Sequence, residues 1–483
     1  MRPLCIFADA RSRERVCEVS SCVRLGLLPC PLMATAESRP AVTAASRATK
    51  WSLAVLIAIN ILNFYDRHVA AAVVEPIRKE FLLTDTQLGW INTAFTILYG
   101  VVGLPLGRLA DRVSRKKLLS AGVAVWAMLT ACTRWAYSYP FLVFTRLGVG
   151  VGEAAAAPTA TSWIGDLYPP ERRARPLALF MLGVPVGGAL SYFFSGAIAQ
   201  RLGWRAAMLV AAAPALLLIP VLLLLKEPER GHSESSALRG AGASSIRQVL
   251  RIPTFWWIAL SGALVNFNLY GIALFFPALF GRIHHMNVAR AGTTMGIIYA
   301  VGGVLGGWTA GHLGDRMAQG GRGRMKIAAV AALLAAPLSY VGIRQGYGAL
   351  AFALPLLTLT YGLLNMYYGL VYAAIQDIVA PALRGTTMAM YFLVMYLSGA
   401  SWGTVIIGKM SDHFALQAAH LAGLQKINEA ARGIGLQQAL MAIPVLSALL
   451  ALVLWAGSNT IGKDIERSRE APKSPVQESG AAL

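Results

Sequence analysis

Apolar residues gather along this chain in long runs that are separated by short polar stretches rich in arginine and lysine. A membrane-spanning helix needs roughly 20 mostly apolar residues. Twelve runs reach that length, and they predict helices at about residues 51–72, 87–107, 118–137, 140–163, 175–199, 205–225, 254–280, 291–313, 326–344, 348–376, 386–410 and 436–457. The pattern therefore predicts an all-α membrane protein with twelve transmembrane helices.

Two sequence motifs recur and divide the predicted helices into related halves. The first occurs twice, 204 residues apart, as Gly103, Gly107, Asp111 and Arg112 and then as Gly307, Gly311, Asp315 and Arg316. The second occurs twice, 211 residues apart, as Asp166, Pro170 and Arg173 and then as Asp377, Pro381 and Arg384. Parallel repeats of six helices with the substrate between them are a known transporter architecture. We therefore predict two pseudo-symmetric six-helix bundles, residues 51–225 and 254–457, joined by a polar linker at 226–253.

The composition agrees with a membrane location. Of the 483 residues, 56% are hydrophobic and only 14% are charged, whereas a soluble domain carries about 25% charged residues. The net charge is +20, but the cations lie between apolar runs, which argues against nucleic-acid binding. Loops on one side of the predicted bundle hold 18 lysines and arginines, and loops on the other hold 10. Because cytoplasmic loops carry the excess of cations, we expect both termini and the linker in the cytoplasm, and the inner membrane if the host is a bacterium.

The two ends of the chain lie outside the predicted bundles. Residues 1–50 are arginine-rich and lack a signal-peptide pattern, so they predict a disordered extension. We interpret residues 1–32, which precede Met33, either as part of this extension or as the product of an upstream start that is not used. Residues 458–483 predict a cytoplasmic tail. Four of the five cysteines fall within the first 30 residues without zinc-ligand spacing, and the Walker, H-E-x-x-H and G-x-S-x-G motifs do not occur. We expect no metal, no cofactor and no enzymatic activity.

Four ionisable residues fall well inside predicted helices: Asp66 and Arg67 in the first, Arg146 and Glu153 in the fourth. Each would cost roughly 2.5–3.5 kcal/mol at the centre of a membrane helix. Their charges cancel, so we expect them to pair or to face a wet cavity. Arg67 shares a polar helical face with Asn60 and Asn63, whereas Asp66 points about 100° away. We therefore expect Arg67 to reach the cavity or Glu153, and Asp66 to face a second helix.

In the second half, uncharged polar and aromatic side chains take the place of these charges. The seventh run carries Asn266 and Tyr270, and one face of the tenth carries Tyr361, Asn365, Tyr368 and Tyr372. Tyrosine has an apolar ring and a polar tip, so it suits the damp wall of a cavity. Packing between helices is the alternative. A cavity charged on one wall and aromatic on the other favours an amphiphilic cargo.

Several motifs resemble those of one known family. The loop from Gly107 to Lys117 matches the G-x-L-x-D-R-x-x-R-K signature of the major facilitator superfamily, with Ser114 where glycine is usual. The segments Arg146–Glu153 and Gly183–Gly188 resemble its fourth-helix and fifth-helix motifs, and the similarity spans about Trp51 to Trp455. Within the superfamily, Asn63–Arg67, with Glu153 and Pro185 in their local motifs, resembles the spinster-like branch, whose characterised members move lysolipids and sphingolipids. The first helix also resembles the anion:cation symporters of sugar acids.

The resemblance implies a secondary transporter that works by alternating access, with the first and fourth helices lining a central cavity. We interpret Glu153, and after it Asp66, as the group that couples transport to protons; the alternative is a permanent structural salt bridge. The expected cargo is an amphiphilic, lipid-like or other organic molecule. The alternatives are a small organic anion, or a receptor that transports nothing. The expected partners are the cargo, protons and the bilayer, and the expected state is a monomer.

The loop motifs also suggest moving parts. An acid near a helix end can stabilise the positive N-terminus of a neighbouring helix. We therefore interpret one set of motif residues as a latch on the cytoplasmic side: Gly107, Asp111, Arg112, Arg115, Asp166, Arg173, Asp315, Arg316, Asp377 and Arg384. The alternative is that these cations only fix the topology. Pro185, flanked by Gly183, Gly187 and Gly188, predicts a bend in the fifth helix, which is either a gate or a packing kink.

Overall fold

The computed structural model describes residues 47–110, 112–169, 172–228, 244–316, 320–379 and 383–470. The predicted extension up to residue 46, linker residues 229–243 and the tail beyond residue 470 lie outside these ranges. So do Asp111, Pro170 and Pro381 of the repeated motifs. From Arg47 onward the chain forms one compact unit.

The first half contains nine α-helices and a short 3₁₀ turn within its described residues. They are α1 (Arg47–Ala72), α2 (Val74–Phe81), α3 (Asp85–Ala110), α4 (Arg115–Cys132) with the turn Thr133–Trp135, α5 (Tyr139–Ala154), α6 (Ala156–Leu167), α7 (Ala174–Met181), α8 (Gly183–Leu202) and α9 (Trp204–Leu224).

The second half follows a short helix that lies within the predicted linker, α10 (Ser244–Leu250). Its helices are α11 (Pro253–Ile283), α12 (Val288–Ile297), α13 (Gly303–Arg316), α14 (Gly320–Ile343), α15 (Leu350–Asp377), α16 (Arg384–Met395), α17 (Ser401–Leu421), α18 (Glu429–Ala439) and α19 (Ala442–Glu470). Two π-helical turns, Ile298–Gly302 and Tyr396–Ala400, join α12 to α13 and α16 to α17.

These helices form the twelve predicted membrane segments. By length and composition, ten of the described segments are apolar enough to cross a membrane. The other two, α3 and the α5–α6 pair, carry polar side chains that are buried within the protein, including Thr93 and Thr96 of α3, which are both fully buried. The predicted class, an all-α membrane protein of two six-helix halves, is confirmed.

Several predicted boundaries are wrong, and the larger differences occur where the helix is longer than the apolar run. Helix α1 begins at Arg47 rather than at residue 51, α17 continues to Leu421, and α19 continues to Glu470. Polar residues continue these helices because a helix beyond the membrane keeps its backbone hydrogen bonds. In α19 a tertiary contact adds to this: the backbone N–H and the hydroxyl of Thr254, in the first turn of α11, donate to Asp464 at 3.1 and 2.6 Å. Residues 458–470 of the predicted tail are therefore helical.

Two membrane segments are divided near a proline. Helix α5 ends at Ala154, four residues before Pro158, and α7 ends at Met181, four residues before Pro185. The proline ring clashes with the carbonyl four residues earlier and removes one backbone hydrogen bond, which explains both positions. The second break lies in the helix for which the sequence predicts a bend.

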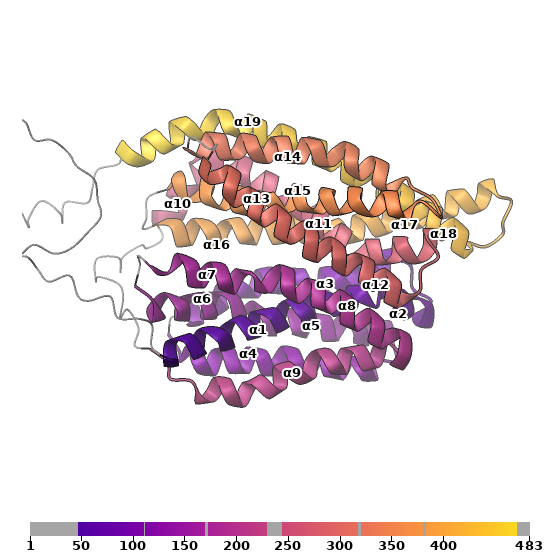
Figure 1. Ribbon diagram of the computed structural model, residues 1–483, viewed down its shortest axis with the longest axis horizontal. Helices are drawn as coiled ribbons and strands as arrows, with labels where there is room; N and C mark the ends of the chain where they lie inside the picture. The colour runs from indigo at the N-terminus through magenta and orange to yellow at the C-terminus, as the bar shows by residue number, and fades with distance from the viewer. Residues whose placement is uncertain are drawn as a thin grey trace, which may run out of the picture. The chain divides into compact units, whose positions relative to one another are not determined.

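The two halves touch along two seams, α3 against α17 and α8 against α12. At the second seam a Cβ on Gly292 would lie 2.5 Å from the backbone oxygen of Tyr192, so only glycine fits there. In Figure 1, helix α10, the start of α1 and the end of α19 lie at one end of the helices, here termed the linker end. Helices α2 and α18 lie at the opposite end, here termed the far end.

Candidate functional site

A buried ion pair joins α1 to α5 in the middle of the first half. The Nε and Nη2 atoms of Arg67 donate to the same carboxylate oxygen of Glu153, Oε2, at 3.0 and 2.9 Å. The side chain of Glu153 is fully buried, and that of Arg67 is 5% exposed. The other oxygen, Glu153 Oε1, has no hydrogen-bond partner among the residues that the structure describes.

Aromatic rings enclose the Arg67 guanidinium. Its central carbon lies 4.6, 5.2 and 4.4 Å from the ring centres of Phe64, Phe95 and Tyr99, distances at which a cation is attracted to a ring face. Tyr99 in turn lies edge-on against Tyr396, at 5.0 Å between ring centres. Because Tyr396 belongs to the second half, within a π-helical turn, the second half contacts the enclosure of the ion pair directly.

The other two buried charges meet through a third helix. Thr130 of α4 donates its hydroxyl to Asp66 Oδ2 at 2.8 Å and accepts a hydrogen bond from Nη2 of Arg146 at 3.1 Å. All three side chains are almost fully buried. Within the described residues, Asp66 Oδ1 and Arg146 Nε have no hydrogen-bond partner. Asp66 and Arg67 therefore face different helices, α4 and α5.

Close packing of α4 and α5 holds this arrangement in place. A Cβ on Gly152 would lie 2.7 Å from the backbone nitrogen of Trp126, so the two backbones touch one residue before Glu153. Trp126 lies one helical turn before Thr130 on α4. The glycine of α5 thus lets α4 come close enough for the Thr130 hydroxyl to reach between Asp66 and Arg146.

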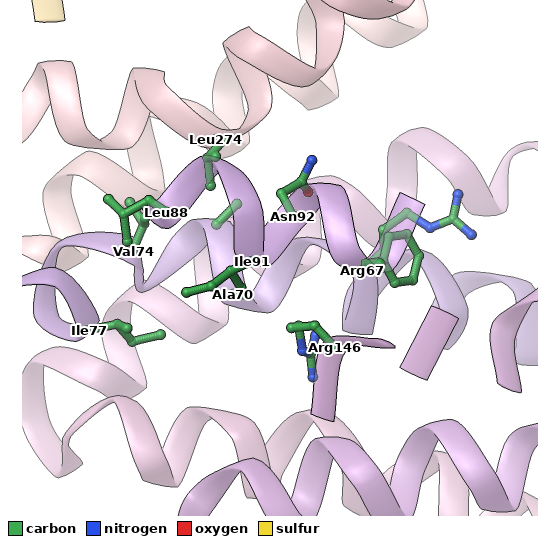
Figure 2. Close-up of a pocket in the computed structure, with 11 residues that line it drawn as sticks. Arg67, Ala70, Val74, Ile77, Leu88, Ile91, Asn92, Arg146 and Leu274 are labelled. Atoms are coloured by element: carbon green, nitrogen blue, oxygen red, sulfur yellow. The ribbon is translucent and has the colours of Figure 1, made fainter. Parts of the chain in front are cut away.

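A cavity of about 30 Å³ lies beside Arg67 and Arg146 (Figure 2). That volume holds about one water molecule. Toward the far end its lining is apolar, with Val74, Leu88 and Leu274 among the residues. The guanidinium of Arg67 points away from these apolar side chains (Figure 2).

The two asparagines of the first helix have different surroundings. Asn60 Nδ2 donates to the backbone oxygen of Phe180 at 2.7 Å, and this bond fixes α7 to α1 just before the break at Leu182. Asn63 is buried, and its Nδ2 has no hydrogen-bond partner in the described part of the chain. Asn60 therefore holds two helices together.

The aromatic residues of the tenth segment do not act as one surface. Tyr361 stacks on Tyr299 at 4.5 Å and Asn365 donates to the backbone oxygen of Gly303, so both pack against the neighbouring segment α12–α13. Tyr368 donates to Asn266 Oδ1 at 3.0 Å. Tyr372 lies against Tyr391 and Phe392 of α16, and Tyr270 of α11 lies against Tyr396 in the π-helical turn that follows α16.

At the linker end the predicted latch residues pair within each half. Asp166 is bound by Arg115, which lies in the first turn of α4. In the second half Arg324 binds Asp377 at 2.6 Å, so the two motif acids have equivalent partners. Arg112, Asp315 and Arg316 are exposed. The other two latch arginines bind backbone oxygens: Arg173 that of Tyr168 and Arg384 that of Gln376.

Glu227, which the sequence analysis missed, completes the linker-end pair of the first half. It accepts hydrogen bonds from the Ser114 hydroxyl and the backbone N–H of Arg115 at 2.7 and 2.9 Å, and so caps α4. Partial burial would raise the pKa of Glu227. The hydrogen bonds from Ser114, Arg115 and Lys116 outweigh this effect and hold that pKa below its ordinary value.

At the far end, ion pairs cross between the halves, and sequence analysis missed them. Arg282 of α11 binds Asp85 of α3 through two bonds of 2.7 Å and binds Glu75 of α2 at 2.9 Å. Arg78 of α2 binds Glu429 of α18 at 2.6 Å. The charges clustered after the first membrane helix were the available sign of such ion pairs. The sequence alone does not show which residues of the second half lie opposite them.

Asp412 of α17 strengthens the same junction. It accepts hydrogen bonds from the backbone N–H groups of Asp85 and Thr86, both at 2.9 Å, at the N-terminus of α3. An acid at that position also interacts favourably with the helix dipole. Among the described residues, every ion pair between the halves lies at this far end.

Two related six-helix halves, joined at one end and with charged groups buried in the core, define a multi-pass membrane transporter. The chain belongs to the Major Facilitator Superfamily, whose sequence model matches residues 56–404. An MFS-type efflux pump of Mycolicibacterium smegmatis is 30% identical over 363 residues, which are 75% of this chain and 84% of the pump. Protein spinster homolog 1 of Homo sapiens is 29% identical over 74% of this chain and 72% of its own length.

Solved structures agree with these relatives. A bacterial homologue of the human lysosomal transporter spinster, in an inward-facing and unoccupied conformation, has a TM-score of 0.78 and 28% identity, covering 87% of this chain and 99% of that one. A D-xylose–proton symporter has a TM-score of 0.66 at 18% identity, covering 84% and 97%, and shows the shared fold alone. The predicted likeness to the spinster-like branch is confirmed.

Proposed function

We propose that this transporter is a secondary carrier that works by alternating access, and that a proton on Glu153 couples the movement of an amphiphilic organic cargo. The observation that carries the proposal is the Arg67–Glu153 pair. It combines a carboxylate with no exposure to solvent, a single arginine partner and one oxygen left without a partner. A buried pair of this kind is held by mutual attraction that protonation would remove.

The geometry suggests how a proton could drive movement. Protonation neutralises Glu153 and weakens its hold on Arg67, which remains a cation in both states. Arg67 is enclosed by Tyr99, and Tyr99 lies against Tyr396 of the second half. A shift of Arg67 would therefore change a contact between the halves, and rocking of the halves would change the surroundings of Glu153. The alternative remains a permanent structural pair that locks α1 to α5.

The far-end ion pairs support a state closed on that side. We infer that the linker end faces the cytoplasm, because the loops there carry the excess of cations. The structure would then be open toward the cytoplasm, like the inward-facing structure to which it is similar. Outward opening would require the bonds of Arg282 to Glu75 and Asp85 to break.

The cargo class follows from the two sides of the core. The first half supplies charges and the second supplies tyrosines such as Tyr270, Tyr368 and Tyr372, an arrangement that suits a polar head and an apolar tail. The relatives include proteins named as an efflux pump and as homologues of a lysosomal transporter. A small organic anion is the second candidate, since a buried arginine is the residue that such an anion would need.

Uptake into proteoliposomes tests the proposal. A lysophospholipid and a hexuronate would be compared with and without a pH gradient, in the wild type and in Glu153→Gln and Asp66→Asn. We expect the gradient to accelerate lysophospholipid transport in the wild type and not in Glu153→Gln. Preference for the hexuronate would overturn the cargo class. Full proton-driven transport in both variants would overturn the coupling.

A further inference from the structure

Of the buried polar groups around the ion pair, Thr130 alone has hydrogen bonds to two of the four charges within the described residues. It lies on α4, which carries none of these charges, and its hydroxyl is fully buried. The Asp66–Thr130 and Arg146–Thr130 contacts of 2.8 and 3.1 Å are the recorded hydrogen bonds of both partner side chains. The sequence offered no sign of it, because a hydroxyl within an apolar run is common.

We propose that Thr130 is a positioning residue for Asp66, the second carboxyl group of the proposed proton site, because its hydroxyl ties the carboxylate of Asp66 on α1 to the guanidinium of Arg146 on α5. The inference rests on the proposed proton coupling and deepens it. Helices α1 and α5 are then held together at two places. One is the direct pair of Arg67 with Glu153, and the other is the bond chain that runs through Thr130.

The direction of the bond chain depends on the charge of Asp66. A hydroxyl has one proton to donate and can accept two hydrogen bonds. Arg146 can only donate, so Thr130 must accept from it and can donate its own proton to ionised Asp66. When Asp66 takes up a proton on Oδ2, that oxygen becomes a donor toward the same hydroxyl. The Thr130 oxygen then accepts from both Asp66 and Arg146, so the bond to Asp66 reverses its direction and the proton of Thr130 must find another acceptor.

The charged groups that surround Asp66 make this link relevant to coupling. Arg67 lies next to it on α1, and Arg146 and Glu153 interact with it electrostatically from α5. Arg146 and Glu153 are seven residues apart and lie on one face of the helix, two turns from each other. A proton at Asp66 therefore acts on the same helix that carries Glu153, and Thr130 transmits its effect to Arg146.

The substitution Thr130→Val removes the hydroxyl and keeps the shape, while Thr130→Ser keeps the hydroxyl. The first readout is infrared difference spectroscopy of the reconstituted protein between acid and alkaline pH, in the region where protonated carboxylic acids absorb. Asp66→Asn identifies the Asp66 band. Without its donor, ionised Asp66 is less stable, so we expect the midpoint of this band to move by about one pH unit or more toward alkaline pH in Thr130→Val. It should return to the wild-type value in Thr130→Ser.

The second readout is the pH profile of proton-driven transport of a fluorescent lysophospholipid, which should move in the same direction. Thr130→Ala serves as a second deletion of the hydroxyl if the valine variant does not fold. A wild-type midpoint in a folded hydroxyl-less variant would overturn the role of Thr130. If Glu153→Gln and Asp66→Asn both keep full proton-driven transport, the proposed coupling fails instead, so the two failures are distinguishable.

Discussion

Replacing Arg282 by glutamine should open the far end of the protein. The arginine is 2% exposed and provides the cation that binds both Asp85 and Glu75 across the junction of the halves. Removing one partner of a buried pair costs about 3–5 kcal/mol, because the remaining charge stays buried without compensation. The cost applies to the closed state and largely disappears when the halves separate and water reaches the acids.

The expected shift is large enough to measure. Since each 1.4 kcal/mol is a factor of about ten, 3 kcal/mol moves the equilibrium between closed and open far ends by roughly 100-fold. The assay is a distance measurement by pulsed electron resonance between spin labels at positions 202 and 421, in a chain without native cysteines. Leu202 and Leu421, at the ends of α8 and α17 in different halves, are 72% and 91% exposed.

We expect the distance distribution of Arg282→Gln to gain a longer component. The matched control is Arg290→Gln, which removes an exposed arginine of the same half and should leave the distribution unchanged. Adding Asp85→Asn to Arg282→Gln should restore part of the closed population, because it removes the acid that loses its arginine partner, whereas Glu75 is still bound by Arg78 at 3.0 Å. An unchanged distribution in Arg282→Gln, or an equal change in Arg290→Gln, would refute the reasoning.

Three further substitutions probe other parts of the account. Glu227→Gln should lower the midpoint of thermal unfolding at neutral pH. The pKa of Glu227 is lower in the folded protein than in the unfolded chain, so its charge stabilises the folded state above the unfolded-chain pKa of about 4.3, and this stabilisation is lost as the pH falls through the folded-state pKa. The difference in midpoint between the variant and the wild type should therefore shrink as the pH falls below about 4.3. Gly292→Ala places a Cβ 2.5 Å from a backbone oxygen of α8, so it should destabilise the closed far end by about 1–3 kcal/mol in the same distance assay. Gly307→Ala, where nothing lies within 4 Å, is its control and should leave the closed state unchanged. Tyr396→Leu removes aromatic pairs with Tyr99 and Tyr270, so it should slow proton-driven transport roughly five- to a hundredfold, while Tyr396→Phe should keep the wild-type rate.

The fold could be predicted because hydrophobicity alone decides which segments enter the membrane. The twelve apolar runs and the two repeated motifs were sufficient for the class, and the errors fall where polar residues extend a helix, as in residues 458–470 of α19. The two π-helical turns had no sequence signal. A π turn depends on how one helix packs against its neighbours, and the same residues are compatible with an ordinary α-helix.

The site could be predicted only in part. A charge inside the membrane has a high free-energy cost unless it finds a partner, and this cost alone identified Arg67 and Glu153 as candidate site residues. The partners of Glu75, Arg78 and Asp85 could not be predicted, because loop charges can remain in water and therefore have no obligatory partner. Hydrogen bonds made by a single hydroxyl, as in Thr130, leave no mark on composition or periodicity.

Cargo exchange and cargo accumulation in Glu153→Gln test the central claim most directly. With labelled lysophospholipid on both sides of the proteoliposome membrane and no pH gradient, exchange needs rocking of the halves but no net proton movement. Accumulation against a concentration gradient needs the proton. If Glu153 carries it, Glu153→Gln keeps exchange and loses accumulation driven by the pH gradient. Accumulation at the wild-type level in this variant would contradict the account.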